Sequence, residues 1–599
     1  MMAKEKFYET GKIGLIAGTV TLCLCMIGLV ESFDQRDIIT DTFTLGQLLL
    51  YAGAIVAGFI VVTRQAVNKL GIKLLHGAIA GALSGIAPFV LILITLRWET
   101  IRDSFINVSP ALISIMTLGQ ESLVAGSLRL VGIFTLLGLV GVLFSIISGR
   151  IRKAIITGLI WSLTLGMMSE ILVGVLRSRL SKESMDSLFG KSGLQLNAFM
   201  IVFILIVAFS YWWRQSGQAG YEQTRSKLSV KQRSWSGRIG YVGLFVFLMI
   251  LPSFLGVYLS EIFNNVGLYI LMGLGLNIAV GLAGLLDLGY VTNFAVGAYV
   301  MALLTTSSEY GVNDPISFWL ALPICLLAAM FTGFFFALPV LRMRGDYLAI
   351  ATLGFGEIVR ILARSDALKT VIGGAQGILQ VPQARIAGFL GEMIITITTP
   401  INSFLSHYNL GVLSGEEGVV LFGKPPQLYY IMLLGCLFML FISRRLNNSR
   451  TGRRWMAIRE DEDVAAAMGI NTTNAKVLAF TLSAASGGIA GAIFAAKLGS
   501  IFPHSFQLLI SINVLSLIIV GGIGSLPGVI VGAFALIGIP ELLREFAEFR
   551  LFLYGIALIV MMLVRPEGLW PSETRKREMG RGGESGGGLT AVNIQPSGD

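Results

Sequence analysis

Charged residues are scarce in this 599-residue chain. Asp, Glu, Lys and Arg make up only 13% of it, about half the share of an ordinary soluble domain. The mean hydropathy is +0.77, and apolar runs such as IGLIAGTVTLCLCMIGLV recur along the chain. Runs of this length cross a hydrocarbon layer of about 30 Å. The composition argues against a soluble enzyme and predicts an all-α, polytopic integral membrane protein.

Histidine and cysteine are also rare, with three and four copies. The histidines are far apart in sequence, and the cysteines all lie inside apolar runs. This pattern indicates buried thiols rather than a disulfide framework or a metal cluster. The acids are too dispersed for a catalytic constellation. We therefore expect that this chain alone is not an enzyme and holds no cofactor or metal.

One segment matches the pattern of a phosphate-binding loop. The sequence GVVLFGK at 418–424 fits GxxxxGK, but Pro425 follows it where Ser or Thr is needed. We interpret the match as chance, and we expect no nucleotide site in this chain.

Hydropathy predicts about 14 to 16 transmembrane helices, some of them interrupted. No convincing cleavage site follows the first apolar run, so we interpret it as a retained helix rather than a signal peptide. Six spans come before a polar, basic linker at 214–238, and the others follow it. The predicted spans are 11–31, 44–63, 74–96, 127–148, 153–176, 195–213, 239–259, 262–281, 285–306, 316–340, 346–363, 427–443, 474–498, 508–521, 526–543 and 549–564.

Four parts follow from this pattern. They are a six-helix membrane module of unknown role at 1–213, the linker at 214–238, a membrane core at 239–571 and a disordered tail at 572–599. Glycine-rich stretches in the core, such as GLGLNIAVGLAGLLDLG and IIVGGIGSLPG, indicate either close helix packing or interrupted helices around a polar path.

The formal net charge of +10 is concentrated in short connections between apolar spans. Basic connections lie on the cytoplasmic side of membrane proteins. If the linker is cytoplasmic, then 149–153, 341–345 and both termini fall on the same side, whereas the cations of 177–184 fall outside. We expect a multi-pass protein of the bacterial inner membrane with both termini in the cytoplasm and the loop at 364–426 outside.

A charged segment, SRTGRRWMAIREDEDVAAAMGI at 449–470, stands out in this apolar chain. Within it, EDEDVAAAMG is predicted to form a short helix, and the acids at its start, Glu460 to Asp463, suit the positive end of the helix dipole. Val464, Ala465 and Met468 would form a small apolar patch on that helix, and Gly469 suits a left-handed end. The residues allow two interpretations: a solvated loop with arginines at the headgroup level, or a helix that docks on a soluble partner.

The same segment resembles the coupling segment of membrane permease subunits of branched-chain amino acid ABC importers of the LivM type. The resemblance rests on Gly452 and Arg453, AIREDED at 457–463, Ala465 to Ile470, and KVLAFTLSAASGGIAGAIFAA from Lys476. Segments at 281–304, 339–362, 516–536 and 565–571 resemble the same subunits in the same order. The resemblance covers about 240–571 and does not reach the first 235 residues.

This resemblance implies a permease for branched-chain or other neutral amino acids. It implies as partners a homologous second permease, two cytoplasmic ATPases that hold ATP and Mg²⁺, and an external solute-binding protein. It also implies a coupling helix that contacts the ATPases. Its residues would be Arg459, Glu460, Asp461, Glu462, Asp463, Ala465, Ala466, Met468 and Gly469.

The translocation path is predicted from polar residues in apolar surroundings. The candidates are Asp287, Thr352, Glu357 and Arg360. Glu357 would lie about 17 Å along a helix that starts at the cytoplasmic face. Charge at that depth faces protein or water, so Glu357 and Arg360 either hold helices together as an ion pair or line a path for a zwitterion.

Three alternatives remain open from the sequence. Within the same family, the chain could be a permease for urea or short amides. In a different class, it could be a stand-alone, ion-coupled secondary transporter, although no convincing internal repeat supports that. It could also be a membrane scaffold or sensor.

Overall fold

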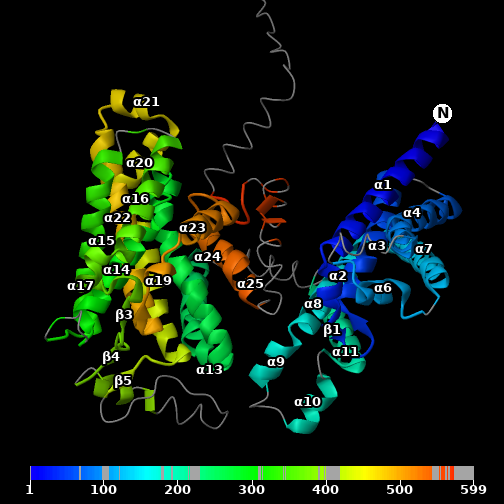
Figure 1. Ribbon diagram of the computed structural model, residues 1–599, viewed down its shortest axis with the longest axis horizontal. Helices are drawn as coiled ribbons and strands as arrows, with labels where there is room; N and C mark the ends of the chain where they lie inside the picture. Colours follow the sequence, from blue (N-terminus) through cyan, green and yellow to red (C-terminus); the bar gives the residue numbers. More distant parts are fainter. Residues whose placement is uncertain are drawn as a thin grey trace, which may run out of the picture. The chain divides into compact units, whose positions relative to one another are not determined.

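The structure is a computed structural model of the chain (Figure 1). It describes residues 2–65, 69–97, 107–120, 122–176, 181–190, 193–213, 215, 230–307, 312, 314–340, 343, 346–388, 391–396, 398–399, 419–542 and, with gaps, 552–572. The predicted tail from 573 onward, most of the linker and most of the predicted span at 549–564 lie outside these residues.

The chain forms two compact units, Met1–Gly243 and Leu244–Asp599. Nine described helices are long and apolar enough to cross a membrane, and one bent pair adds a tenth candidate. This confirms the predicted all-α, polytopic membrane fold. The helix labelled α13 (Val230–Asn277) is interrupted at Gly256, whose φ of +70° is not helical, so the predicted spans at 239–259 and 262–281 correspond to its two parts.

The first unit is built around a bundle of four long helices. These are α1 (Met2–Met26), α3 (Leu45–Gln65), α4 (Leu70–Arg97) and α7 (Leu123–Ile146). The helices approach closely at glycines, because a side chain at Gly138 of α7 would overlap the backbone of α4 at Gly77 and Gly81. The shorter elements of this unit are α2 (Leu29–Asp34), β1 (Asp37–Ile39), β2 (Phe43–Thr44), α6 (Pro110–Thr117), α9 (Ser169–Leu176) and α10 (Lys182–Leu188).

Two further helices of the first unit, α8 (Gly149–Met167) and α11 (Leu196–Trp212), pack against each other. The chain turns by 67° between α8 and α9. The contact between α8 and α11 is again at a glycine, since a side chain at Gly158 would overlap Val207. Strands β1 and β2 pair antiparallel and place Asp37 opposite Thr44.

The second unit is a helical bundle centred on α22 (Thr472–Leu498), which packs between α14 (Val291–Thr305) and α15 (Phe318–Val340). Gly488 of α22 meets Gly297 of α14. Around this core lie α13 (Val230–Asn277), α16 (Asp346–Arg364), α17 (Lys369–Ile372), α19 (Pro425–Asn447), α20 (Arg450–Glu460), α21 (Glu462–Ala467), α23 (Leu508–Gly521), α24 (Leu526–Ala533) and α25 (Ile539–Leu542).

Short strands and helical turns complete the second unit. The antiparallel pairs are β3 (Ile378–Leu379) with β6 (Ser500–Ile501), and β4 (Arg385–Ile386) with β5 (Val420–Leu421). The turns are η2 (Ile278–Leu282), η3 (Asp366–Leu368), η4 (Gly374–Gln376), η5 (Pro503–Ser505) and η6 (Phe534–Gly538).

Both glycine-rich stretches contain a break in the helix, which confirms the prediction of interrupted helices. In the first break, α13 ends in the π-helical turn η2, and α14 begins only at Val291. In the second break, α23 ends at Gly521 and α24 begins at Leu526. The two breaks touch, because a side chain at Gly281 would lie 2.8 Å from the Gly524 nitrogen.

Candidate functional site

The charged segment forms two short helices joined at Asp461. Ser449 caps α20, because its hydroxyl accepts a hydrogen bond of 3.0 Å from the Gly452 N–H. Asp461 caps α21, because its carboxylate accepts hydrogen bonds from the N–H groups of Asp463 and Val464, at 2.9 and 3.0 Å. In Figure 1, α20 and α21 lie together at one end of the bundle. We call residues 450–469, from the start of α20 to the glycine that ends α21, the hook.

The hook is fastened to α22 by buried contacts. Trp455 is fully buried, and its indole N–H donates to the Ala475 carbonyl at 2.7 Å. Lys476 is buried, and its ammonium lies 2.5 Å from the Glu462 carboxylate. Since both partners belong to the first turn or two of α22, displacement of the hook strains the central helix of the unit.

The free face of the hook differs from the predicted apolar patch. Val464 and Met468 are 58% and 79% exposed, as the prediction requires, but Ala465 is buried. The prediction that Val464, Ala465 and Met468 share one exposed face is wrong, because α21 packs against the rest of the unit through Ala465. Gly469 adopts the predicted left-handed conformation, with φ of +83°. The hook therefore presents two apolar side chains, Val464 and Met468, with the exposed side chains of Glu460 and Asp463 nearby in sequence.

Arg459 turns away from this free face and enters the bundle. Its Nη1 donates to the Gly281 carbonyl at 2.9 Å, and its Nη2 lies 3.0 Å from the Glu460 carboxylate. Gly284 makes room for it, because a Cβ at that position would lie 2.7 Å from the Arg459 Cγ. Gly284 also has φ of +70°, which glycine adopts most readily. Arg459 thus joins the last turn of α20 to the first helix break.

The second break is tied to the first by the Asn277 side chain. Its Oδ1 accepts a hydrogen bond of 2.9 Å from the Gly524 N–H. The segment at 565–571 also holds the second break. The N–H groups of Leu569 and Trp570 donate to the carbonyl groups of Val520 and Gly521, at 2.8 and 2.9 Å respectively. Hydrogen bonds therefore join Arg459 to the first break and the first break to the second.

Two of the predicted path residues meet at the first break. The Thr352 hydroxyl of α16 accepts a hydrogen bond of 3.1 Å from the Leu288 N–H, next to Asp287. Asp287 is buried and accepts a hydrogen bond of 3.0 Å from the Gly289 N–H. No described cation lies within ion-pair distance of it. Thr352 therefore holds α16 to the broken segment, whereas the hydrogen bond of Asp287 lies within that segment.

The other two predicted path residues form an ion pair on α16. The Arg360 guanidinium lies 2.7 Å from the Glu357 carboxylate, and both side chains are half-buried. Arg360 also lines a pocket of about 310 Å³ between α14 and α16. The other residues of this pocket are almost all apolar and include Val291, Ala295, Val300, Leu303, Val359, Ile372 and Phe506.

Two hydroxyl groups on the wall of this pocket are buried without a hydrogen-bond partner. They belong to Thr292 and Tyr299, whose side chains are 3% and 8% exposed. A buried hydroxyl without a partner costs free energy, and such groups are uncommon outside functional sites. The pocket therefore combines aliphatic walls with a few polar groups, as small-molecule sites do.

The sequence analysis missed helix α20 and the inward direction of Arg459. The sequence did contain one signal for α20. Gly452, Trp455 and Ile458 recur every three residues, which is helical spacing, and the structure buries all three. The contact from Arg459 to Gly281 joins residues 178 positions apart, and no local pattern reports such a contact. No group of three His, Cys, Asp or Glu that could hold a metal occurs among the described residues.

Comparison with known proteins matches the second unit to a transport family. A family model described as the permease component of branched-chain amino acid transport systems matches residues 258–564. The high-affinity branched-chain amino acid transport permease LivM of Escherichia coli K12 is 40% identical over 319 residues, 53% of this chain and 71% of that protein. No solved structure matches the chain.

Two more relatives support the assignment. LivM of Salmonella typhimurium is 42% identical over 51% of this chain and 68% of its own length. LivH of Escherichia coli K12, the high-affinity permease of that name, is 25% identical over 52% of this chain and 95% of its own length. The match to the family model falls on the unit that carries the hook and the helix breaks. The chain belongs to the family of branched-chain amino acid transport permeases of the LivM type.

Proposed function

We propose that this chain forms half of the translocation path of an ATP-driven importer for branched-chain amino acids. The hook carries this proposal, since it joins an exposed docking face to the broken helices of the bundle through Arg459. The second half of the path comes from a homologous permease, two ATPases supply the energy, and an external binding protein delivers the amino acid. The names of the relatives support this substrate class.

In this proposal the hook lies in the cytoplasm, where the ATPases bind. Val464 and Met468 insert into an apolar groove of an ATPase, as an exposed amphipathic helix does. When the ATPases close on ATP, the hook moves and takes α22 with it through Trp455 and Lys476. Arg459 transmits the same motion to the two breaks, whose backbone lacks the rigidity of a continuous helix.

The pocket between α14 and α16 is the proposed contact site for the amino acid. Its aliphatic walls suit a branched side chain. Arg360 lines it and is ion-paired with Glu357, and this pair offers opposite charges to the ammonium and carboxylate groups of a zwitterion. An apolar pocket favours leucine, isoleucine and valine over urea or a short amide, which have little apolar surface to bury. Transient contact suffices, because the binding protein makes the first selection.

In the orientation that we propose, both termini are cytoplasmic and the protein spans the bacterial inner membrane. The basic connections described above support this orientation through the positive-inside rule. ATP and Mg²⁺ bind to the partner ATPases rather than to this chain.

The test is leucine uptake by the complete transporter in liposomes. We expect uptake that needs ATP on the ATPase side, and that stops with vanadate or with a substitution of the phosphate-loop lysine of the ATPase. Uptake driven by an ion gradient without ATP would overturn the proposal, and transport of urea in place of leucine would overturn its substrate class.

The pocket itself is tested by filling it. Val359→Trp places a large side chain in the space of about 310 Å³, so we expect leucine uptake to fall at least about tenfold, as overpacked sites do. Ile361→Trp is the matched control, because Ile361 is exposed on the same helix and does not line the pocket. Equal uptake by the two variants would remove the pocket from the path.

A further inference from the structure

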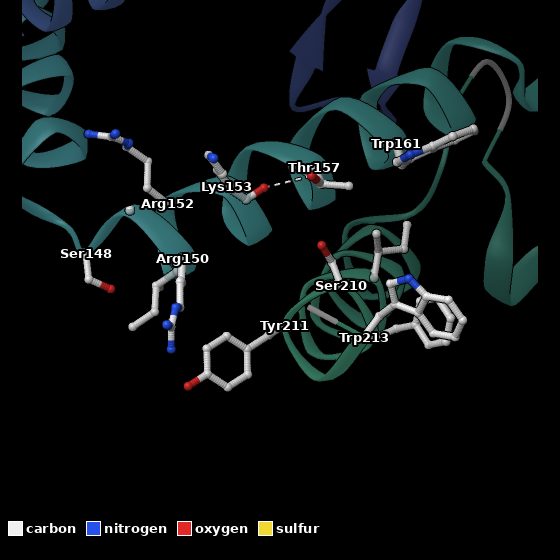
Figure 2. Close-up of a pocket in the computed structure, with 13 residues that line it drawn as sticks. Ser148, Arg150, Arg152, Lys153, Thr157, Trp161, Ser210, Tyr211 and Trp213 are labelled. Atoms are coloured by element: carbon white, nitrogen blue, oxygen red, sulfur yellow. Dashed lines mark hydrogen bonds between the residues drawn. The ribbon is translucent and has the colours of Figure 1, made fainter. Parts of the chain in front are cut away.

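A large cavity lies in the first unit, outside the part of the chain that matches the family model (Figure 2). Its volume is about 1310 Å³, and it lies between the start of α8 and the end of α11. In Figure 2 the Arg150 side chain extends from the start of α8 toward the Tyr211 ring of α11. Its lining includes Arg150, Arg152, Lys153, Trp161, Ile206 and Tyr211.

One end of this cavity is cationic. Arg150, Arg152 and Lys153 line it, and no acid does. Arg150 and Lys153 are exposed, and no acidic partner is found for them among the described residues. Arg152 is held differently, because its guanidinium lies 5.5 Å from the centre of the Phe59 ring of α3. Two cations therefore remain available to a ligand of negative charge.

The other end of the cavity is apolar and aromatic. Trp161 is 56% exposed and lies eight residues beyond Lys153, about 12 Å further along α8 at 1.5 Å per residue. Ile206 and Phe209 of α11 also line the cavity. Tyr211, near the end of α11, lies instead beside Arg150 at the cationic end, as aromatic residues do at the boundary between the hydrocarbon layer and water. The cavity thus changes from charged to apolar along the direction of the helix.

We propose that this cavity binds an anionic glycerophospholipid. The phosphate lies at Arg150 and Lys153, and an acyl chain runs along Trp161 and Ile206. An amphiphile matches both ends of the cavity, whereas a soluble anion would leave the apolar end empty. Basic pockets between membrane helices bind anionic headgroups by the same electrostatics. This gives the first unit a role that the family does not supply: it holds the protein to anionic lipid.

The proposal is tested with the delipidated full-length chain in its complex, by native mass spectrometry with dioleoylphosphatidylglycerol and dioleoylphosphatidylcholine. We expect tighter binding of the phosphatidylglycerol. Replacing both cations, Arg150→Gln with Lys153→Gln, should weaken its binding by about 30-fold, roughly fivefold for each charge near the membrane surface. Arg64→Gln with Lys69→Gln is the matched control, because both are exposed cations outside the cavity, and its binding should stay unchanged.

Two further measurements distinguish binding of a lipid from binding of a soluble anion. Trp161→Ala should weaken lipid binding and leave the weak binding of sn-glycerol 3-phosphate unchanged, since only the lipid reaches Trp161. The proposal is overturned if glycerol phosphate binds as tightly as the lipid, or if phosphatidylcholine binds as tightly as phosphatidylglycerol. It is also overturned if the double variant at Arg150 and Lys153 binds like its control.

Discussion

At the scale of single residues, Arg459 has the central position in the proposed mechanism. It is the last basic residue of α20, and its guanidinium reaches the Gly281 carbonyl at 2.9 Å. Three other arginines of the same helix precede it, and Arg453 and Arg454 among them are exposed. One arginine of the four in α20 therefore links the hook to the helix breaks, and the other three lie on the exposed surface.

The first prediction concerns this link. Arg459→Gln removes a charge-assisted hydrogen bond, which contributes about 1.5–3 kcal/mol, and should lower leucine uptake about tenfold or more. The complex should still assemble, because the Trp455 and Lys476 contacts remain. Leucine uptake and ATP hydrolysis in proteoliposomes measure the effect. Arg454→Gln is the control, and a loss of uptake as large as that of Arg459→Gln would contradict the assignment.

At the scale of elements, the sequence predicted the helices well and their contacts poorly. Apolar runs determine where a helix crosses a membrane, so the spans at 44–63 and 474–498 correspond closely to α3 and α22. The start of α21 at the acids and its end at Gly469 were also predictable, because capping is local. The burial of Ala465 was not predictable from the sequence, since it depends on packing between segments that are distant in sequence.

The candidate site shows the same division. The spacing of three residues between Glu357 and Arg360 was enough to suggest their ion pair, which the structure contains. The pocket beside Arg360 was not predictable, because its walls come from α14, α16 and the segment near Phe506. Arg459 was assigned to the coupling helix by resemblance, but its direction into the bundle is a property of the fold.

The second prediction concerns α21 as an element. Ala466→Pro removes a backbone donor within this six-residue helix and should cost about 3 kcal/mol, enough to unfold α21. We expect amino-acid-dependent ATP hydrolysis and leucine uptake to be lost, while the chain still inserts into the membrane. Ala467→Ser is the mild control on the same helix. Wild-type coupling in Ala466→Pro would show that α21 does not dock.

At the scale of the whole molecule, different observations indicate the role of each of the two units. The second unit, Leu244–Asp599, contains the matched residues 258–564, the hook and both helix breaks. The first unit, Met1–Gly243, has its own glycine-packed bundle and the cationic cavity. We infer that transport belongs to the second unit, and that the first stabilises the protein in the membrane.

The third prediction follows from this division. A chain that lacks residues 1–235 should assemble in lower yield, but each assembled transporter should keep leucine uptake within about twofold, because compact units fold around their own cores. Uptake is divided by the amount of assembled complex, measured by gel filtration. Assembled complexes without uptake would show that the first unit contributes to the path.

The most direct test of the central claim is a contact at Met468, the residue that follows the last turn of α21 and is 79% exposed. A photo-crosslinking amino acid at this position, in the complete transporter in liposomes, should form an adduct with an ATPase subunit, and its yield should change when ATP binds. An exposed apolar position outside the hook, such as Leu205 of α11, should give no such adduct. Adducts of Met468 with lipid alone, and none with the ATPase, would contradict the account.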